Sequence, residues 1–172
     1  MTVAGLELPA RRGPRPTTHP ANPHSQLDQQ PVEAWVPRLL ATTVFAIPDV
    51  VAGPSGVSVA GARALVLKEG RPAPAGGFMT GREFAHLHPA PDHSLHVVLT
   101  VADAGSVVAA GWGEPHPLAG TVAVPRGLTM VYAPRDAEEV AVVTQIVMAA
   151  ARPQGPGQPS SSSPSKTPSS SA

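Results

Sequence analysis

The prolines of this chain are concentrated towards its two ends, and this limits where a fold can form. Of the 22 prolines in 172 residues, six lie between Pro9 and Pro31 and five between Pro153 and Pro168. Proline donates no backbone N–H and has a fixed φ, so proline-rich segments form neither long helices nor central strands. We therefore expect a disordered proline-rich arm over 1–30, one folded domain over 31–152 and a disordered Ser/Pro-rich tail over 153–172.

The side-chain inventory excludes several classes of function. The chain has no cysteine, which rules out disulfides, thiolate metal ligands and cysteine nucleophiles. Twelve basic residues balance twelve acidic ones and few residues are aromatic, so no nucleic-acid partner is predicted. The sequence contains neither an uninterrupted apolar run of about 18 residues nor the pattern of a signal peptide. We therefore expect a cytoplasmic protein with no membrane partner.

Three helices are predicted from apolar residues at helical spacing. The first has Pro37 in its first turn and reaches about Phe45, with an apolar stripe formed by Val32, Trp35, Leu39 and Leu40. The second follows Thr100, which with Asp103 resembles a capping box, and stops at Gly111. The third begins at Asp136, a good N-cap, and runs to about Arg152.

Strands are predicted between these helices. The apolar runs are Val57 to Lys68, Glu83 to His88, Ser94 to Thr100, Thr121 to Val124 and Leu128 to Ala133. Hairpins and segregated helices are typical of an α+β fold, here a single small domain with a mainly antiparallel sheet and helices packed on one face. A doubly wound sheet is disfavoured because strands and helices do not alternate regularly and no glycine-rich phosphate loop is present.

The hairpin over 83–100 concentrates the histidines of the chain. Five of the seven histidines lie between His86 and His116. Because strand side chains alternate between faces, Phe84, His86 and His88 are expected on one face and Ala85 and Leu87 on the other. If the apolar faces of the two strands coincide and the loop between them has the five residues 89–93, His86 lies opposite His96 and His88 opposite Ser94.

Three imidazoles on facing strands predict a candidate metal site. Cβ atoms of opposed residues lie roughly 4.5–5.5 Å apart, so His86, His88 and His96 can converge on one Zn²⁺ or Fe²⁺ ion or on an anionic ligand. Glu114 and His116, in the turn over 111–117, can add a carboxylate or a fourth nitrogen. The alternative is that these imidazoles hydrogen-bond backbone groups on a half-exposed sheet face.

Other positions carry less specific signals. Trp112, between two glycines, lies either over a pocket or, as large aromatic residues usually do, in the core. Ser55 lacks the spacing of a nucleophile elbow, and its segment is predicted to be a turn. Asp92 and His93 are predicted to form the hairpin tip.

Two sequence blocks resemble a known family. They are Phe-Ala-His-Leu-His-Pro at 84–89 and Gly-Trp-Gly-Glu-Pro-His-Pro at 111–117, and with their surroundings they are similar to small bacterial and fungal proteins of the luciferase-domain family. The resemblance covers about Trp35 to Ala151. It implies a shared fold and shared polar positions, namely His86, His88, Ser94, His96, Trp112, Glu114 and His116. It does not imply light emission. Where that family commonly has glycine, this chain has His93.

Three functions are compatible with these observations. The first is a small-molecule binding or accessory domain with a histidine-rich pocket, which requires only polar groups that converge beside apolar walls. The second is a metal-dependent oxidoreductase or hydrolase, with His86, His88 and His96 as ligands and Glu114 or His116 as the acid or base. The third is a protein-interaction module that uses a sheet edge. The sequence names no catalytic residue and no protein partner.

Overall fold

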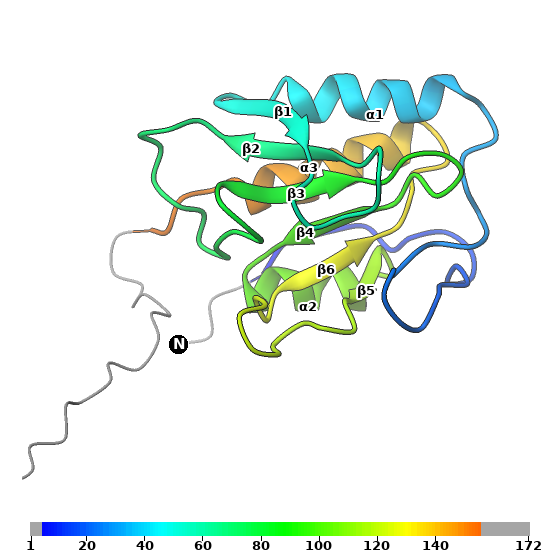
Figure 1. Cartoon of the computed structure of the whole chain (residues 1–172). Helices are drawn as coiled ribbons and strands as arrows, with labels where there is room; N and C mark the ends of the chain where they lie inside the picture. The colour runs from blue at the N-terminus through cyan, green and yellow to red at the C-terminus, as the bar shows by residue number, and fades with distance from the viewer. Residues whose placement is uncertain (1–4, 156–172) are drawn as a thin grey trace, which may run out of the picture.

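A six-stranded antiparallel sheet forms the frame of the protein (Figure 1). The computed structural model describes residues 5–155. The strands follow the spatial order β1-β2-β3-β4-β6-β5. The elements are α1 (Trp35–Phe45), β1 (Val50–Pro54), β2 (Arg63–Leu67), β3 (Glu83–Leu87), β4 (Leu95–Val98), α2 (Val101–Ala109), β5 (Gly113–Pro115), β6 (Leu128–Val131) and α3 (Ala137–Ala150). This confirms the predicted α+β class.

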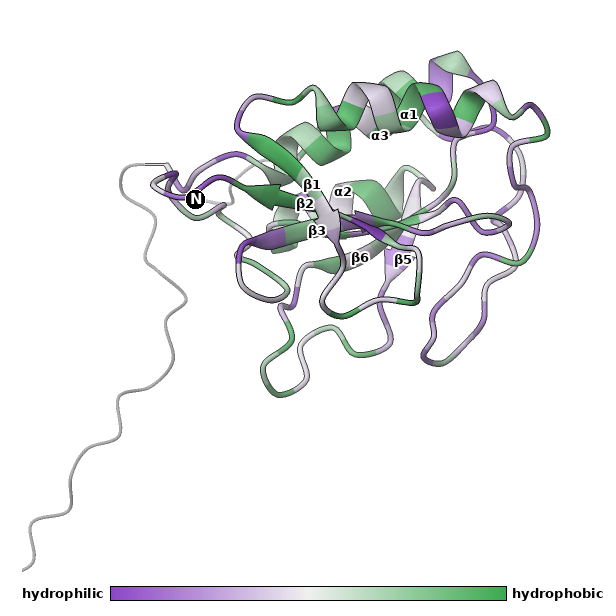
Figure 2. Ribbon diagram, turned by 45° about the horizontal axis from the view of Figure 1, so that its top comes forward, coloured by the Kyte–Doolittle hydropathy of each residue, from purple (hydrophilic) through white to green (hydrophobic). Residues whose placement is uncertain are grey.

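The apolar face of the sheet packs against the helices. Helices α1 and α3 lie side by side over one face, and long loops lie on the other side (Figure 2). Leu65, Leu95 and Val97 come from the strands, are fully buried, and belong to the same core cluster as residues of α1, α3 and α2. Each such buried side chain contributes about 1.5–3 kcal/mol relative to an exposed one.

The helix termini confirm the predicted caps. The Thr100 side chain accepts a hydrogen bond from the backbone N–H of Asp103 at 3.1 Å, and Asp136 accepts from that of Glu139 at 2.9 Å. Helix α1 begins two residues before Pro37, as its place in the first turn requires. Its predicted stripe is wrong in part, since Val36, Leu40 and Val44 are buried whereas Trp35 is 47% exposed.

The strands differ from the prediction at four places. Of the predicted run Val57 to Lys68, only Arg63–Leu67 is a strand. Residues 121–124 form turns rather than a strand, and β1 and β5 were not predicted. The Gly-Pro end of β1 has the composition of a turn, which hides a short edge strand. Gly113 allows β5 to lie close to β6, because a Cβ at that position would lie 2.2 Å from the carbonyl oxygen of Met130. A glycine-rich segment can thus be a strand wherever two backbones approach closely.

A bulge changes which side chains of β3 share a face. The register against β2 shifts between Leu65 and Val66, so Leu65 pairs with Ala85 but Val66 pairs with Glu83. Phe84 therefore joins the apolar core instead of the histidine face, where strict alternation had placed it. The same shift brings the carboxylate of Glu83 to within 2.8 Å of the His86 ring.

The expected disorder of residues 1–30 does not hold for residues 5–30. The arm follows the end of the sheet formed by β5 and β6, where its Arg11, His24 and Gln26 side chains are buried. Its backbone is held by bonds such as Arg11 N–H to the Ala110 carbonyl at 2.8 Å, and the Trp112 indole N–H donates to the Pro9 carbonyl at 2.6 Å. Hydrogen bonds to the domain replace the apolar periodicity that the arm lacks. The predicted tail over 153–172 lies outside the described residues apart from 153–155.

Candidate functional site

A row of residues crosses the non-helical face of the sheet. The paired positions are Ala64 on β2, His86 on β3, His96 on β4, Met130 on β6 and Glu114 on β5. The predicted hairpin register is confirmed, since His86 pairs with His96 and the backbone N–H of His88 donates to the Ser94 carbonyl at 2.9 Å.

Five imidazoles gather on this face. The ring of His96 is the centre, with ring-centroid distances of 4.5 Å to His88, 5.1 Å to His86, 4.6 Å to His116 and 5.5 Å to His24. All five side chains are buried. Within residues 5–155 they form two overlapping groups in which one nitrogen from each ring lies within 4.8 Å of the others. We call His86, His88 and His96 the hairpin cluster, and His24, His96 and His116 the arm cluster.

Two carboxylates orient the rings of the hairpin cluster. Glu83 Oε1 lies 2.8 Å from His86 Nδ1, and Glu83 is itself held by the Ser55 hydroxyl and the Gly56 backbone N–H. Asp92 Oδ2 lies 2.9 Å from His88 Nδ1, while the Ser94 hydroxyl donates to the other Asp92 oxygen. A carboxylate only accepts, so each Nδ1 donates, and in the neutral form of each ring Nε2 is left with a lone pair.

Burial keeps the central imidazoles neutral. It lowers the pKa of His96 well below its usual value, and the surrounding imidazoles lower it further. Burial likewise lowers the pKa of His86, and it lowers that of His116 to about 4. Burial alone would raise the pKa of Glu83, but its hydrogen bonds with His86, Gly56 and Ser55 outweigh this and lower it. His86, His96 and His116 are thus neutral rings close to the ionised carboxylates of Glu83 and Asp92.

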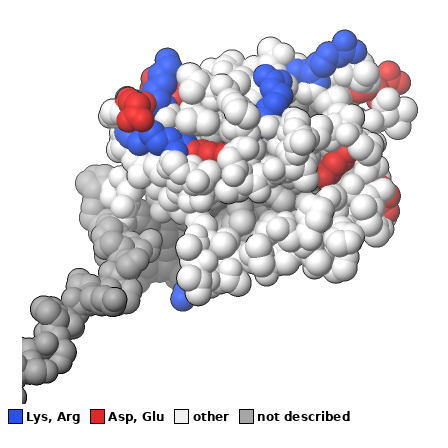
Figure 3. Space-filling view, viewed as in Figure 1, with Lys and Arg blue, Asp and Glu red and all other residues white. Residues whose placement is uncertain are grey.

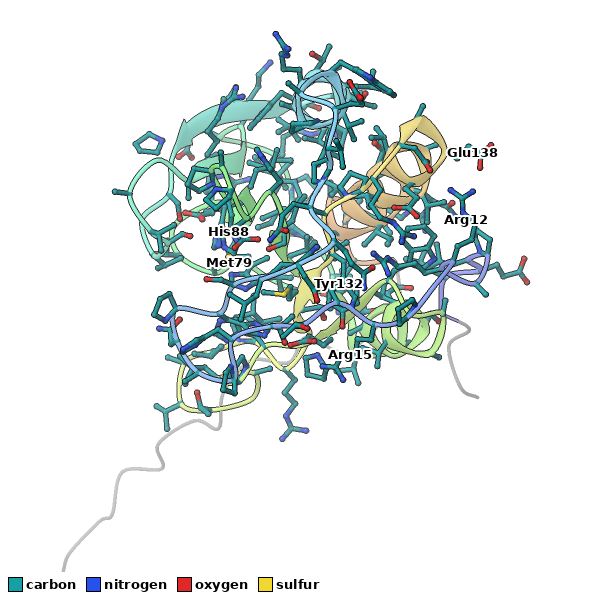
Figure 4. The ribbon with its side chains drawn as sticks, turned by 90° about the vertical axis from the view of Figure 1, so that its right-hand side faces the viewer. Arg12, Arg15, Met79, His88, Tyr132 and Glu138 are labelled. Carbon is teal, nitrogen blue, oxygen red and sulfur yellow. The ribbon has the colours of Figure 1, made fainter. Side chains whose placement is uncertain are left out.

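Glu114 ties the N-terminal arm to the sheet. One of its oxygens accepts from the Thr18 hydroxyl at 2.8 Å and lies 2.7 Å from His24 Nε2, and the other accepts from Arg15 and from the Tyr132 hydroxyl. Figure 4 shows the blue arm passing beside Arg15 and Tyr132. Burial acts to raise the pKa of Glu114, but these hydrogen bonds, that of Arg15 first, lower it to about 2.

Sequence reasoning missed His24. This residue lies in the proline-rich arm, ninety positions before Glu114, and no local pattern connects the two. The polar, proline-rich composition around it is the feature that predicted disorder, so the sequence offers no signal for this contact. Gln26 shows the same behaviour, because its side-chain carbonyl accepts from the Ala133 backbone N–H at 2.8 Å.

A cavity of about 450 Å³ opens over the histidines. Its wall contains all five clustered imidazoles and, among the described residues, one charged side chain, Asp92. Apolar side chains from four segments complete it, including Val59, Met79, Leu118 and Leu128. Figure 3 shows few charged side chains over the middle of the face in view. The cavity therefore combines a polar floor with apolar sides.

The remaining predicted residues lie outside the cavity wall. Ser94 supports His88 from behind, and Glu114 contacts the cavity through His24. Trp112 is 4% exposed and packs in the apolar core, the alternative favoured for it. His93 has a φ of 59°, in the left-handed region that favours glycine, which explains why glycine suits this position.

These features define a small α+β domain with a buried histidine cluster under a cavity. The model of the family described as Luciferase domain matches residues 81–150. A luciferase of Armillaria ostoyae is 36% identical over 160 residues, which cover 83% of this chain and 59% of that protein. A luciferase of Neonothopanus nambi is 46% identical over 72 residues, covering 41% of this chain and 27% of that protein.

The chain belongs to the luciferase-domain family and is homologous to fungal luciferases. It spans 59% of the length of the Armillaria ostoyae and Armillaria gallica relatives. No solved structure matches it. No helix within residues 5–155 is both long enough and apolar enough to cross a membrane.

Proposed function

We propose that this protein binds a small, mainly apolar organic molecule in the 450 Å³ cavity, with the polar end of the ligand against the histidines. The observation that carries this proposal is the contrast between the floor and the sides of the cavity. Ligand sites commonly have volumes of about 300–1,000 Å³ and few polar groups among apolar walls. Homology to proteins named luciferase agrees with a small-molecule ligand.

Ligand-detected NMR on a fragment library tests this proposal. Val124→Trp fills the cavity, which Val124 lines, and Val32→Trp is the matched control because Val32 is 95% exposed and lies outside the cavity wall. We expect apolar fragments with one polar end to bind the natural chain and Val32→Trp, and to lose binding in Val124→Trp. Equal binding to all three proteins, or no binding to the natural chain, contradicts the proposal.

A metal-dependent oxidoreductase or hydrolase is the second candidate function. It is favoured by the two buried histidine groups, which could bind a metal such as zinc or iron. An interaction module is less well supported, because edge strand β5 has three residues and edge strand β1 ends in Pro54.

A further inference from the structure

The two histidine clusters share His96 but differ in what holds their protons in place. An imidazole binds a metal through a nitrogen lone pair, and the partner of its other nitrogen decides which nitrogen carries that lone pair. The contacts of each ring therefore indicate which cluster can accept a cation.

In the hairpin cluster, His86 and His88 present lone pairs. Glu83 and Asp92 hold the protons of His86 and His88 on Nδ1, which frees both Nε2 atoms. A carboxylate that accepts from the other ring nitrogen is a usual partner of a metal-bound histidine, because it fixes the orientation of the ring. Ser55, Ser94 and the Gly56 N–H hold the two carboxylates in turn. His86 and His88 are therefore each oriented by a carboxylate that is itself held by hydrogen bonds.

In the arm cluster a backbone hydrogen bond fixes the position of one proton. The backbone N–H of Leu118 donates to His116 Nδ1 at 3.1 Å, so the neutral ring carries its hydrogen on Nε2. Binding a cation through that nitrogen would require loss of the hydrogen or of the Leu118 contact. His24 Nδ1 is buried without a hydrogen-bond partner in the described structure, as is His96 Nε2. This cluster therefore combines one N–H with two acceptors, a pattern suited to a polar ligand group.

Nitrogen spacing in the hairpin cluster also fits a shared cation. His86 Nε2 lies 3.1 Å from His96 Nδ1. Two ligands of a tetrahedral zinc ion, each about 2.0–2.1 Å from the metal, are about 3.3 Å apart. Without metal, the His96 Nδ1–H donates to the His86 lone pair, so metal binding requires this proton to move to His96 Nε2, which is buried without a hydrogen-bond partner in the described structure. The two rings then need little movement to exchange their hydrogen bond for two metal bonds.

We propose that His86, His88 and His96 bind one divalent first-row transition metal, zinc or iron(II), and that His24 and His116 do not. Glu83 and Asp92 are the positioning residues of this site. Ligation through His96 Nδ1 places the remaining proton of that ring on Nε2, in the arm cluster. His96 and His116 then both present N–H groups to the molecule that the proposed function places in the cavity.

The test counts bound metal in the full chain, so it does not depend on a small-molecule ligand. Purified protein is stripped with a chelator, reconstituted with Zn²⁺ or, without oxygen, with Fe²⁺, desalted and measured by elemental mass spectrometry. His88→Gln removes a ligand unique to the hairpin cluster, and His116→Gln removes a residue unique to the arm cluster. His19→Gln is the control, because His19 is exposed. Circular dichroism and thermal melting establish that each variant is folded.

We expect about one equivalent of metal in the natural chain, His19→Gln and His116→Gln, and a loss in His88→Gln. Glu83→Gln keeps all three ligands and, should His88→Gln not fold, still tests the site. Its metal affinity is expected to fall about 10–100-fold, while Glu138→Gln, at an exposed carboxylate, retains it. Metal retained by His88→Gln but lost by His116→Gln overturns the assignment, as does a natural chain that binds neither ion. Fragment binding without metal would leave the proposed function intact.

Discussion

The hairpin cluster and the arm cluster share one imidazole but are assembled in different ways. The hairpin cluster uses paired strands ten residues apart, with carboxylates from the same hairpin. The arm cluster joins residues 24, 96 and 116, and it depends on the Glu114 side chain, which binds the arm through Thr18 and His24. Local β-geometry thus builds the first cluster, whereas docking of a polar segment builds the second.

The largest expected effect tests the bulge that shapes the hairpin cluster. Phe84→Ala should reduce the free energy of unfolding by about 3–5 kcal/mol, because Phe84 is fully buried in the core instead of lying on the histidine face. Urea denaturation measures this. A cost below about 1 kcal/mol would indicate that strict alternation holds and that Phe84 faces the cavity.

The second-largest expected effect tests whether the N-terminal arm is held independently of the hairpin. Glu114→Gln should reduce the free energy of unfolding by about 1–3 kcal/mol, because buried His24 and Tyr132 lose a charged acceptor. Glu138→Gln is the matched control, and as a surface change it should stay within about 0.5 kcal/mol. Faster proteolysis should be confined to residues 5–30. Uniform acceleration over the whole domain would show that the arm is not a separate unit.

Acid should remove the difference in unfolding free energy between the natural chain and Glu114→Gln. Glu114 has a pKa of about 2 in the folded chain against 4.5 for the unfolded group, so its contribution is fully present above about pH 4.5 and is lost as the pH falls to about 2. Arg15, His24 and Tyr132 are the titratable groups that contact it. The gap in unfolding free energy between the natural chain and Glu114→Gln should therefore narrow over this window. A difference that does not depend on pH would contradict the conclusion that Glu114 is ionised in the folded chain.

The smallest expected effect concerns the hydrogen bond between Tyr132 and Glu114. Tyr132→Phe removes the hydroxyl that donates to Glu114 at 2.8 Å and leaves the ring in place, so it should cost about 0.5–1.5 kcal/mol. Differential scanning calorimetry measures this change. Because the Tyr132 hydroxyl bonds to Glu114 and to none of the clustered histidines within residues 5–155, metal binding at the hairpin cluster should not change. A loss of bound metal would show that the two clusters are not independent.

The difference between the clusters also explains what the sequence could predict. Strand alternation and an odd-length hairpin loop correctly placed His86 opposite His96, because both rules are local. The partnership of Glu83 with His86 was not predictable by alternation, since it arises from the bulge at Leu65 and Val66. His24 was not predicted as a site residue because tertiary hydrogen bonds, rather than an apolar pattern, order the arm. Strand β5 was missed for the related reason that Gly113 serves a close backbone contact.

Anomalous scattering from a crystal of the zinc-loaded protein tests most directly whether the two clusters have different roles. The account predicts one anomalous peak, about 2.0–2.1 Å from a nitrogen of each of His86, His88 and His96, with His116 still accepting from the Leu118 N–H. A peak between His24, His96 and His116, or no peak within either cluster, would contradict it.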